Sequence, residues 1–245
     1  MPYQPFLTAG LDRPGNIICI CDHASNIVPQ FWGSAGLGLE DSEMNRHIAF
    51  DLGAKDLTLQ LAKLFNGPAV LSNFSRLVID PNRGKDDPTL IMKLYDGTII
   101  PANIIISKKE KKRRIKEYYQ PYHCTIEKLL ERMKTPIIIS IHSFTPKLKT
   151  GKKRPWEIGI LHTKDKRLSG SLLKNLKQNK NLCIGNNLPY SGELPGDSLD
   201  KHCITNGYQH VLIELRNDLL SNETIINGWA VYLAKLILKT IKNCK

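Results

Sequence analysis

Several features that define other classes of protein are missing from this sequence. Aromatic side chains make up only 7% of the 245 residues, and none of the six cysteines forms a Cys-x-x-Cys pair. No apolar run approaches the roughly 18–20 residues that span a membrane, and the N-terminal segment lacks the basic start and apolar core of a signal peptide. These absences argue against a disulfide-rich secreted domain and against a membrane protein. The expected location is the cytoplasm.

The cysteines are therefore expected to be reduced and structural. Cys19 and Cys21 alternate within an apolar run, where cysteine behaves as a small hydrophobic residue. The other four are Cys124, Cys183, Cys203 and Cys244.

Charge of one sign is in excess. There are 35 lysines and arginines against 23 acidic residues, a net charge of +12, and basic clusters occupy residues 108–116 and 147–154. Nucleic-acid-binding proteins use such patches for phosphates, but no groove-reading motif is present and aromatic residues for base stacking are scarce. We expect a small anionic partner and no nucleic acid, with nucleic-acid binding as the weaker alternative. The first cluster is interpreted as a solvated helix face, and the second as a surface that steers acidic substrates.

Apolar runs bounded by turn residues alternate with longer amphipathic stretches. Strands are expected at residues 16–21, 69–71, 77–79, 136–141, 157–161, 182–184 and 210–215. Helices are expected at residues 41–65, 108–133, 167–178 and 224–241, with Pro121 kinking or splitting the second. Alternating strands and helices predict one α/β domain over residues 1–245, with three layers: a mixed, mostly parallel sheet covered by helices on both faces.

Polar residues occupy the ends of three predicted strands. His23 follows the strand at 16–21, His142 follows the strand at 136–141, and Glu214 lies near the end of the strand at 210–215. In open α/β sheets, sites form beyond the carboxyl ends of the strands. Two histidines and one carboxylate form the ligand set of a catalytic zinc site, which keeps one position open for water. A further carboxylate is needed to carry protons, and Glu214 fits this role. The alternative is that each histidine only caps its strand.

A series of motifs carries a family resemblance. In chain order they are CDHASN, HIAFDLGA, SRLVIDPNR, SIHSFTP, WEIGIL, YSGELPGDSLDKH and VLIELRNDLL. From Ile17 to Leu220, the chain resembles the N-formylglutamate amidohydrolase family, and particularly its subgroup of predicted N-formylglutamate amidohydrolases. The resemblance implies a fold like that of the zinc carboxypeptidases, with Glu214 as catalytic glutamate. It also implies hydrolysis of the N-formyl amide of glutamate to formate and glutamate.

The resemblance also assigns metal ligands. His23 matches the first metal-binding histidine of the family, and His142 matches the histidine from a later strand. The wider carboxypeptidase pattern reads His-x-x-Glu, but here the fourth position is Asn26, a poor zinc ligand. Our choice for the missing carboxylate is Asp51, which lies four residues after His47 and shares its face on the predicted helix. Asp51, His47 and Asn26 remain the alternatives for the third ligand of one zinc ion.

Candidate substrate-binding residues follow from the same motifs. Asn82 and Arg83 resemble the Asn-Arg pair that binds a substrate carboxylate, with Arg76 as a companion; arginine offers carboxylates a planar fork. Arg216 follows the last predicted strand and is interpreted either as a substrate clamp or as a salt-bridge partner. His202 is a candidate donor to the oxyanion, or a supporting histidine. The sequence thus predicts a metal-dependent amidohydrolase. The alternative is a zinc deacylase or peptidase-like hydrolase with another acyl substrate.

Overall fold

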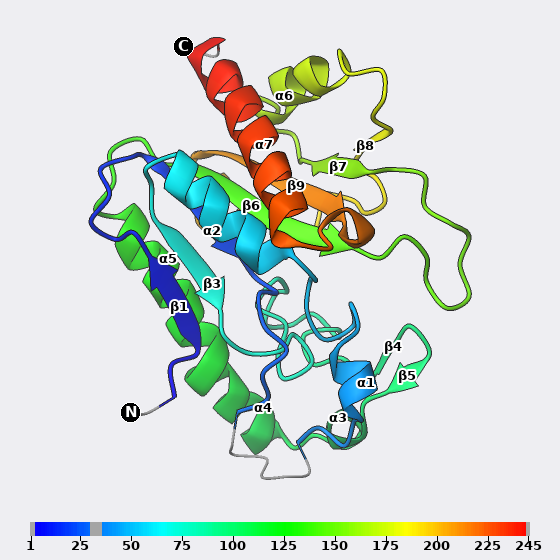
Figure 1. Ribbon diagram of the computed structural model, residues 1–245. Helices are drawn as coiled ribbons and strands as arrows, with labels where there is room; N and C mark the ends of the chain where they lie inside the picture. The colour runs from blue at the N-terminus through cyan, green and yellow to red at the C-terminus, as the bar shows by residue number, and fades with distance from the viewer. Residues whose placement is uncertain (1–2, 30–35, 244–245) are drawn as a thin grey trace.

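A seven-stranded sheet forms the centre of the molecule (Figure 1), which is a computed structural model describing residues 3–29 and 36–243. The strand order is β1-β3-β2-β6-β9-β7-β8, and only the β1–β3 and β7–β9 pairs are antiparallel. The strands are β1 (Phe6–Ala9), β2 (Ile17–Cys21), β3 (Ala69–Ser72), β6 (Ile137–Phe144), β7 (Ile158–Leu161), β8 (Ile184–Asn186) and β9 (Gln209–Arg216). The predicted mixed, mostly parallel sheet is confirmed.

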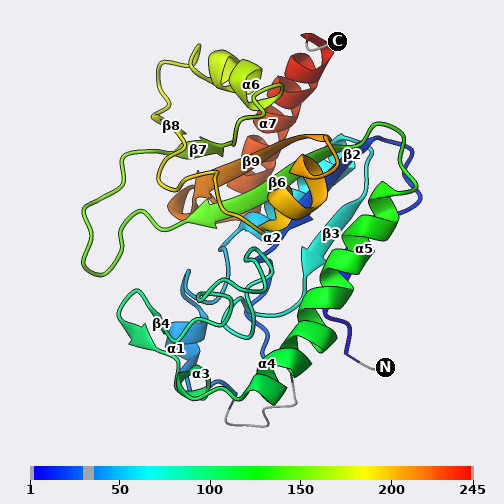
Figure 2. The ribbon, with the colours of Figure 1, turned by 180° about the vertical axis from the view of Figure 1, so that it is seen from behind.

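Helices cover both faces of this sheet, as the two opposite views show (Figures 1 and 2). On one face lie α2 (Ala54–Leu64), α6 (Ser169–Leu176) and α7 (Glu223–Asn243); on the other lie α4 (Lys108–Arg114), the π-helical η2 (Ile115–Tyr119) and α5 (Gln120–Leu130). Successive strand residues alternate between two hydrophobic cores, so Cys19 packs toward α2 while Ile18 and Ile20 pack toward α5. Burial on both faces explains why the strands are continuously apolar.

Smaller elements surround the carboxyl edge of the sheet. They are α1 (Asp41–Met44), α3 (Pro101–Ile104), the hairpin of β4 (Leu94–Tyr95) and β5 (Thr98–Ile99), the π-helical η3 (Asp200–Ile204) and the 3-10 helix η4 (Asn217–Leu219). None of them was predicted as a separate element from the sequence. Together with the loops, they bring polar side chains to the ends of β2, β6 and β9.

Two sequence predictions about secondary structure are wrong. The expected helix at residues 41–65 is broken, because only α1 and α2 are helical and residues 45–53 between them are irregular. The expected strand at residues 77–79 is a turn, in which the Val78 amide donates to the Ser75 carbonyl. The edge of the sheet beside β3 is occupied by β1 instead, so the buried run at 77–79 has no strand to pair with.

The helical stretch made of α4, η2 and α5 changes from α-helical to π-helical geometry near Pro121, where the sequence predicts a kink or a split. Pro121 has no amide hydrogen to donate to the preceding turn, and the π-helical turn η2 lies immediately before α5, which contains this proline. Ser107 caps the N-terminus of α4, and its hydroxyl accepts from the Glu110 amide. The cluster at 108–116 is not simply solvated, because the buried Arg114 donates to the carbonyl of Val78 and to the side chain of Asn103.

Helix α7 is, within the described residues, the one helix long and apolar enough by composition to cross a membrane. One side of it packs into the core through Ile226, Ala230, Leu233 and Ile237, opposite α2 and α6. Core helices commonly have this composition. Among the cysteines, Cys19, Cys21 and Cys203 are buried, Cys124 and Cys183 are exposed, and all five are unpaired. Cys244 lies outside the described residues.

Candidate active site

Three side chains singled out at strand ends meet at the carboxyl edge of the sheet. Strands β2, β6 and β9 are neighbours, and they carry His23, His142 and Glu214 to this edge. His142 and Glu214 are register partners on β6 and β9. All three side chains line one cavity of about 440 Å³.

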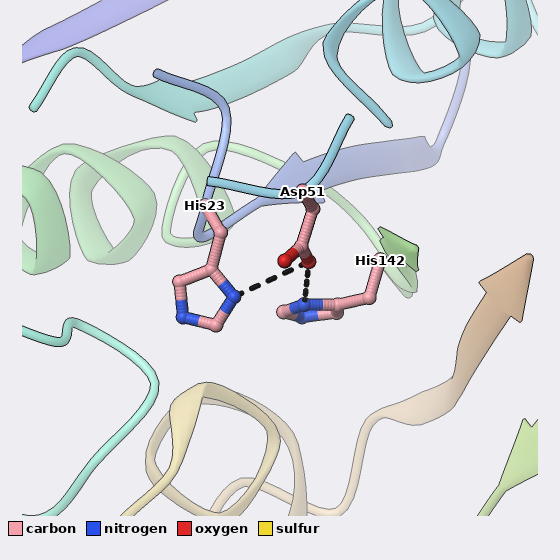
Figure 3. A group of neighbouring side chains, drawn as sticks. All are labelled: His23, Asp51 and His142. Atoms are coloured by element: carbon pink, nitrogen blue, oxygen red, sulfur yellow. Dashed lines mark hydrogen bonds and ion pairs between the residues drawn. The ribbon is translucent and has the colours of Figure 1, made fainter. Parts of the chain in front are cut away.

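His23, Asp51 and His142 form a compact group, whose potential ligand atoms all lie within 4.8 Å of one another (Figure 3). The Nδ1 atom of His23 is 3.3 Å from Asp51 Oδ2, and Nδ1 of His142 is 2.8 Å from the same oxygen. Each residue comes from a different segment: the loop after β2, the irregular segment before α2, and β6. We call these three residues the His-Asp-His group.

The break before α2 is what brings Asp51 to this place. The Asp51 amide donates to the His23 carbonyl over 2.9 Å, and this hydrogen bond joins the two loops that carry Asp51 and His23. Gly53 then starts α2 with φ of 76°, and a Cβ there would lie 2.4 Å from the Leu220 Cβ; only glycine fits without strain. The other proposed third ligands lie outside the group: His47 lines the cavity, and the Asn26 amide donates to the Met44 carbonyl.

The outer nitrogens of both histidines face carboxylates that the sequence analysis did not identify. Nε2 of His23 lies 2.7 Å from Asp80 Oδ1, and Nε2 of His142 lies 3.2 Å from Asp22 Oδ2. A carboxylate that accepts from Nε2–H leaves the lone pair on Nδ1, which is the arrangement found behind metal-binding histidines. The sequence contains one clue to these two carboxylates, which is their position: Asp22 directly precedes His23, and Asp80 lies in the SRLVIDPNR motif.

Charge in the group is concentrated and buried. Burial disfavours the charged carboxylates, but hydrogen bonds and positive charge from His142 and His23 outweigh it and hold the pKa values of Asp22 and Asp51 below their ordinary range. Burial likewise opposes charge on His142, yet its bonds to Asp22 and Asp51 raise its pKa well above the usual value. Two Nδ1 atoms and a carboxylate amid further anionic groups fit a divalent metal ion such as zinc.

Glu214 has the properties of a proton carrier. Its side chain is only 6% exposed, it faces the cavity, and its Oε2 atom has no hydrogen-bond partner among the described residues. Burial, reinforced by the charge of Asp51, raises the pKa of Glu214 to about 7 despite the opposing charge of His142. A carboxyl group that titrates near neutrality can both accept and return a proton.

Three of the predicted substrate-binding residues line the cavity. Arg83 donates to Thr89 Oγ1 and to the Asn82 carbonyl, which holds its guanidinium at the wall. Arg76 is more fully engaged, because it lies 2.9 Å from Asp80 Oδ2 and 3.5 Å from Asp51 Oδ1. Arg76 therefore supports the carboxylates around the His-Asp-His group, and Arg83 has the more accessible guanidinium.

Two other predicted residues are not part of the cavity lining. Arg216 donates to Asp218 Oδ1 over 2.8 Å and lies close to the carbonyls of residues 154–156. His202 is buried in η3, where its Nε2 lies 2.7 Å from Nδ1 of His123. The structure thus brings Arg216 into a salt bridge and His202 into a histidine pair, both outside the space where a substrate would bind.

Comparisons with known proteins agree with this architecture. Residues 15–221 match the family model described as N-formylglutamate amidohydrolase. The crystal structure of gene product Atu2144 from Agrobacterium tumefaciens is 31% identical, with a TM-score of 0.93 over 98% of this chain and 96% of that one. The N-formylglutamate amidohydrolase from Ralstonia eutropha JMP134 is 20% identical, with a TM-score of 0.73 over 96% of each chain, and shares the fold. No curated protein matches the chain.

Proposed function

Because the chain belongs to the N-formylglutamate amidohydrolase family, and is thus an amidohydrolase acting on an amide C–N bond, we propose that it deformylates N-formylglutamate or a closely related N-acyl acidic amino acid. One observation carries the proposal: the His-Asp-His group lies in the same cavity as a buried glutamate with an unpartnered oxygen. The partner is a small anionic amino-acid derivative rather than a nucleic acid, and we expect the enzyme in the cytoplasm.

The His-Asp-His group holds one divalent ion in this proposal, with zinc as the first choice. Support comes from the donor types and from Asp80 and Asp22, which face the outer nitrogens of the two histidines. When bound, such an ion lowers the pKa of a water ligand toward neutrality and polarises a carbonyl oxygen. Arg76 restrains Asp51 and Asp80 from behind.

Glu214 moves the proton. Its carboxylate accepts a proton from the attacking water as the water oxygen bonds to the formyl carbon. The same carboxyl group then gives that proton to the amide nitrogen as the C–N bond breaks, which releases formate and the free amino acid. A pKa near 7 suits both steps, because neither proton transfer is then strongly uphill.

Arg83, supported by Asn82, binds one carboxylate of the substrate. Its guanidinium borders the cavity with side-chain exposure of 19%, against 9% for Arg76. A charge-assisted hydrogen bond from this fork selects acidic substrates and orients the amide toward the His-Asp-His group.

A panel of acyl groups tests the proposal. The zinc-loaded chain is given N-formyl-, N-acetyl- and N-succinyl-L-glutamate, and release of free glutamate is measured. We expect the formyl substrate to have the highest kcat/KM, by about 10-fold or more, since extra carbon atoms must fit beside Glu214. Faster turnover of the acetyl or succinyl compound would instead make the protein a deacylase of another kind. A Glu214→Gln preparation, purified in parallel, controls for a contaminating hydrolase.

A further inference from the structure

His47 has an unused polar atom that the proposed reaction does not explain. Its side chain is 12% exposed and lines the cavity, and its buried Nε2 has no hydrogen-bond partner among the described residues. The nearest carboxylate oxygen, Oδ2 of Asp96, is 3.4 Å away, and Tyr95 packs edge-on against the ring. The His47 ring thus borders the cavity, while its Nε2 atom is buried beside Asp96.

A second incompletely used group, Arg154, lies against two rings of the cavity wall. The guanidinium of Arg154 packs against the rings of Phe144 and Tyr190, 5.8 and 5.1 Å from their centroids, and both rings line the cavity. Its Nη1 donates to the Thr145 carbonyl and to Tyr190 Oη. In the part of the chain that the structure describes, Nε and Nη2 of Arg154 have no hydrogen-bond partner. Tyr190 accepts from Arg154, so its own hydroxyl proton is free to be donated.

Three arginines lie close enough to His47 to act on its charge. Burial, together with the positive charges of Arg46, Arg154 and Arg76, lowers the pKa of His47 even though Asp96 opposes the shift. Asp96 is paired with Arg46, which lies 2.7 Å from Oδ2 and also pairs with Glu43, and the Lys149 amide donates to Oδ1.

A series of contacts along the cavity connects His47 with Arg83. Arg83 is 3.9 Å from Asp80, which pairs with Arg76; Arg76 in turn lies over the Tyr95 ring, and Tyr95 contacts His47. Both terminal nitrogens of Arg76 face carboxylates, so Arg83 and Arg154 are the less engaged guanidinium groups near the cavity. Two such groups suit a ligand with two carboxylates.

We propose that Arg154, Tyr190 and His47 form a second carboxylate subsite, which takes the substrate carboxylate that Arg83 does not hold. This inference rests on the proposed function and names the residues that recognise the second carboxylate of the acidic substrate. Arg154 supplies the charge, the Tyr190 hydroxyl supplies a further donor, and the His47 ring forms the adjoining part of the cavity wall.

The test pairs variants with substrate amides. N-formylglutamate is compared with its side-chain amide, N-formylglutamine, and its α-amide, N-formylisoglutamine. Arg154→Gln is expected to lower kcat/KM for N-formylglutamate about 10-fold or more, and the loss should vanish for one of the two monoamides. The loss caused by Arg83→Ala should vanish for the other. Tyr190→Phe removes only the hydroxyl and should produce a smaller loss with the same substrate dependence as Arg154→Gln.

Lys153→Gln is the matched control, because Lys153 is an exposed neighbour of Arg154 in the same loop. If it changes the substrate preference as much as Arg154→Gln, the effect is long-range steering and the subsite is wrong. An equal loss for all three substrates in both the Arg154 and Tyr190 variants, or no loss, also overturns the subsite.

Binding of L-glutamate to the zinc-loaded chain, measured by calorimetry, separates the two proposals. If no N-formyl compound is hydrolysed, yet Arg154→Gln or Tyr190→Phe weakens glutamate binding and Lys153→Gln does not, the subsite stands and the proposed reaction fails. If N-formylglutamate is hydrolysed but neither the Arg154 nor the Tyr190 variant changes turnover or binding, the reaction stands and the subsite fails.

Discussion

His142 and Glu214 occupy the same register position on two adjacent parallel strands, β6 and β9. Side chains in register on neighbouring strands leave the sheet on the same face, so both reach the cavity at its carboxyl edge. The imidazole is held on both nitrogens by Asp51 and Asp22, whereas Oε2 of Glu214 has no partner in the described chain. Strand β6 thus contributes an imidazole held on both nitrogens, and β9 contributes a carboxyl group with one unpartnered oxygen in the described chain.

Metal content should depend on His23. Replacing it with alanine removes one of three donors, and we expect His23→Ala to lose stoichiometric zinc in elemental analysis after dialysis. His47→Gln is the matched control, because His47 lines the same cavity outside the His-Asp-His group. Full zinc content in His23→Ala would remove this residue from the metal site, and loss of zinc in His47→Gln would restore His47 as the third ligand.

Glu214→Gln should separate chemistry from binding. The amide keeps the size of the side chain but cannot accept and return the proton, so kcat should fall by about 100-fold or more while zinc content and melting temperature are retained. Glu193 is an acidic residue on the same cavity wall, and Glu193→Gln should lower kcat far less. A near-normal kcat in Glu214→Gln would contradict its role as the proton carrier.

Arg83 should discriminate by charge. Arg83→Ala is expected to lower kcat/KM for N-formylglutamate by about 10- to 150-fold, which corresponds to the loss of a charge-assisted hydrogen bond. For the analogue in which both carboxylates are replaced by carboxamides, Arg83→Ala should lower kcat/KM only slightly. Arg83→Lys should recover only part of the preference, because lysine keeps the charge without the planar fork. Equal losses for acid and diamide would make Arg83 structural.

Asp197 should make the fold less stable as pH rises. Burial raises its pKa to about 7 in the folded chain, whereas the unfolded value is near 3.8. Between these values the folded state binds more protons, so the free energy of unfolding falls with rising pH, by up to about 1.4 kcal/mol per unit. Asp197→Asn removes this dependence while its oxygen can still accept from the Asp200 amide.

Thermal melts across pH 5 to 8 test this expectation. Asp197→Asn should have the flatter profile and the higher melting temperature at pH 8, whereas the exposed control Asp86→Asn should follow the wild type. Parallel profiles for wild type and Asp197→Asn would show that this carboxyl group titrates normally.

The residues at the strand ends could be predicted from the sequence because the sheet determines where they lie. Buried runs of isoleucine, valine and leucine predict strands, and adjacent parallel strands end at one edge, so the meeting of His23, His142 and Glu214 follows from short-range pattern and topology. The prediction of Asp51 as a ligand depends on a continuous helix, which the structure does not have. The actual position of Asp51 depends on the bond from its amide to the His23 carbonyl, a long-range contact.

Other features depended on contacts that no local pattern encodes. The run at 77–79 is as apolar as a strand but is buried as a turn, since β1 occupies the edge beside β3. The pairing of Asp80 with His23, and the stacking of Arg154 on Tyr190, join segments far apart in the chain. Arg216 and His202 have the right chemical types, yet their partners, Asp218 and the distant His123, hold them outside the cavity.

Formate release as a function of zinc loading tests the central claim most directly. The chain is stripped with a chelator, titrated with zinc, and assayed with N-formyl-L-glutamate. We predict that the rate of formate release rises in proportion to added zinc and levels off at one ion per chain, in step with the zinc content measured on the same samples. A stripped chain that releases formate at the full rate, or a loaded chain that releases none, would contradict the account.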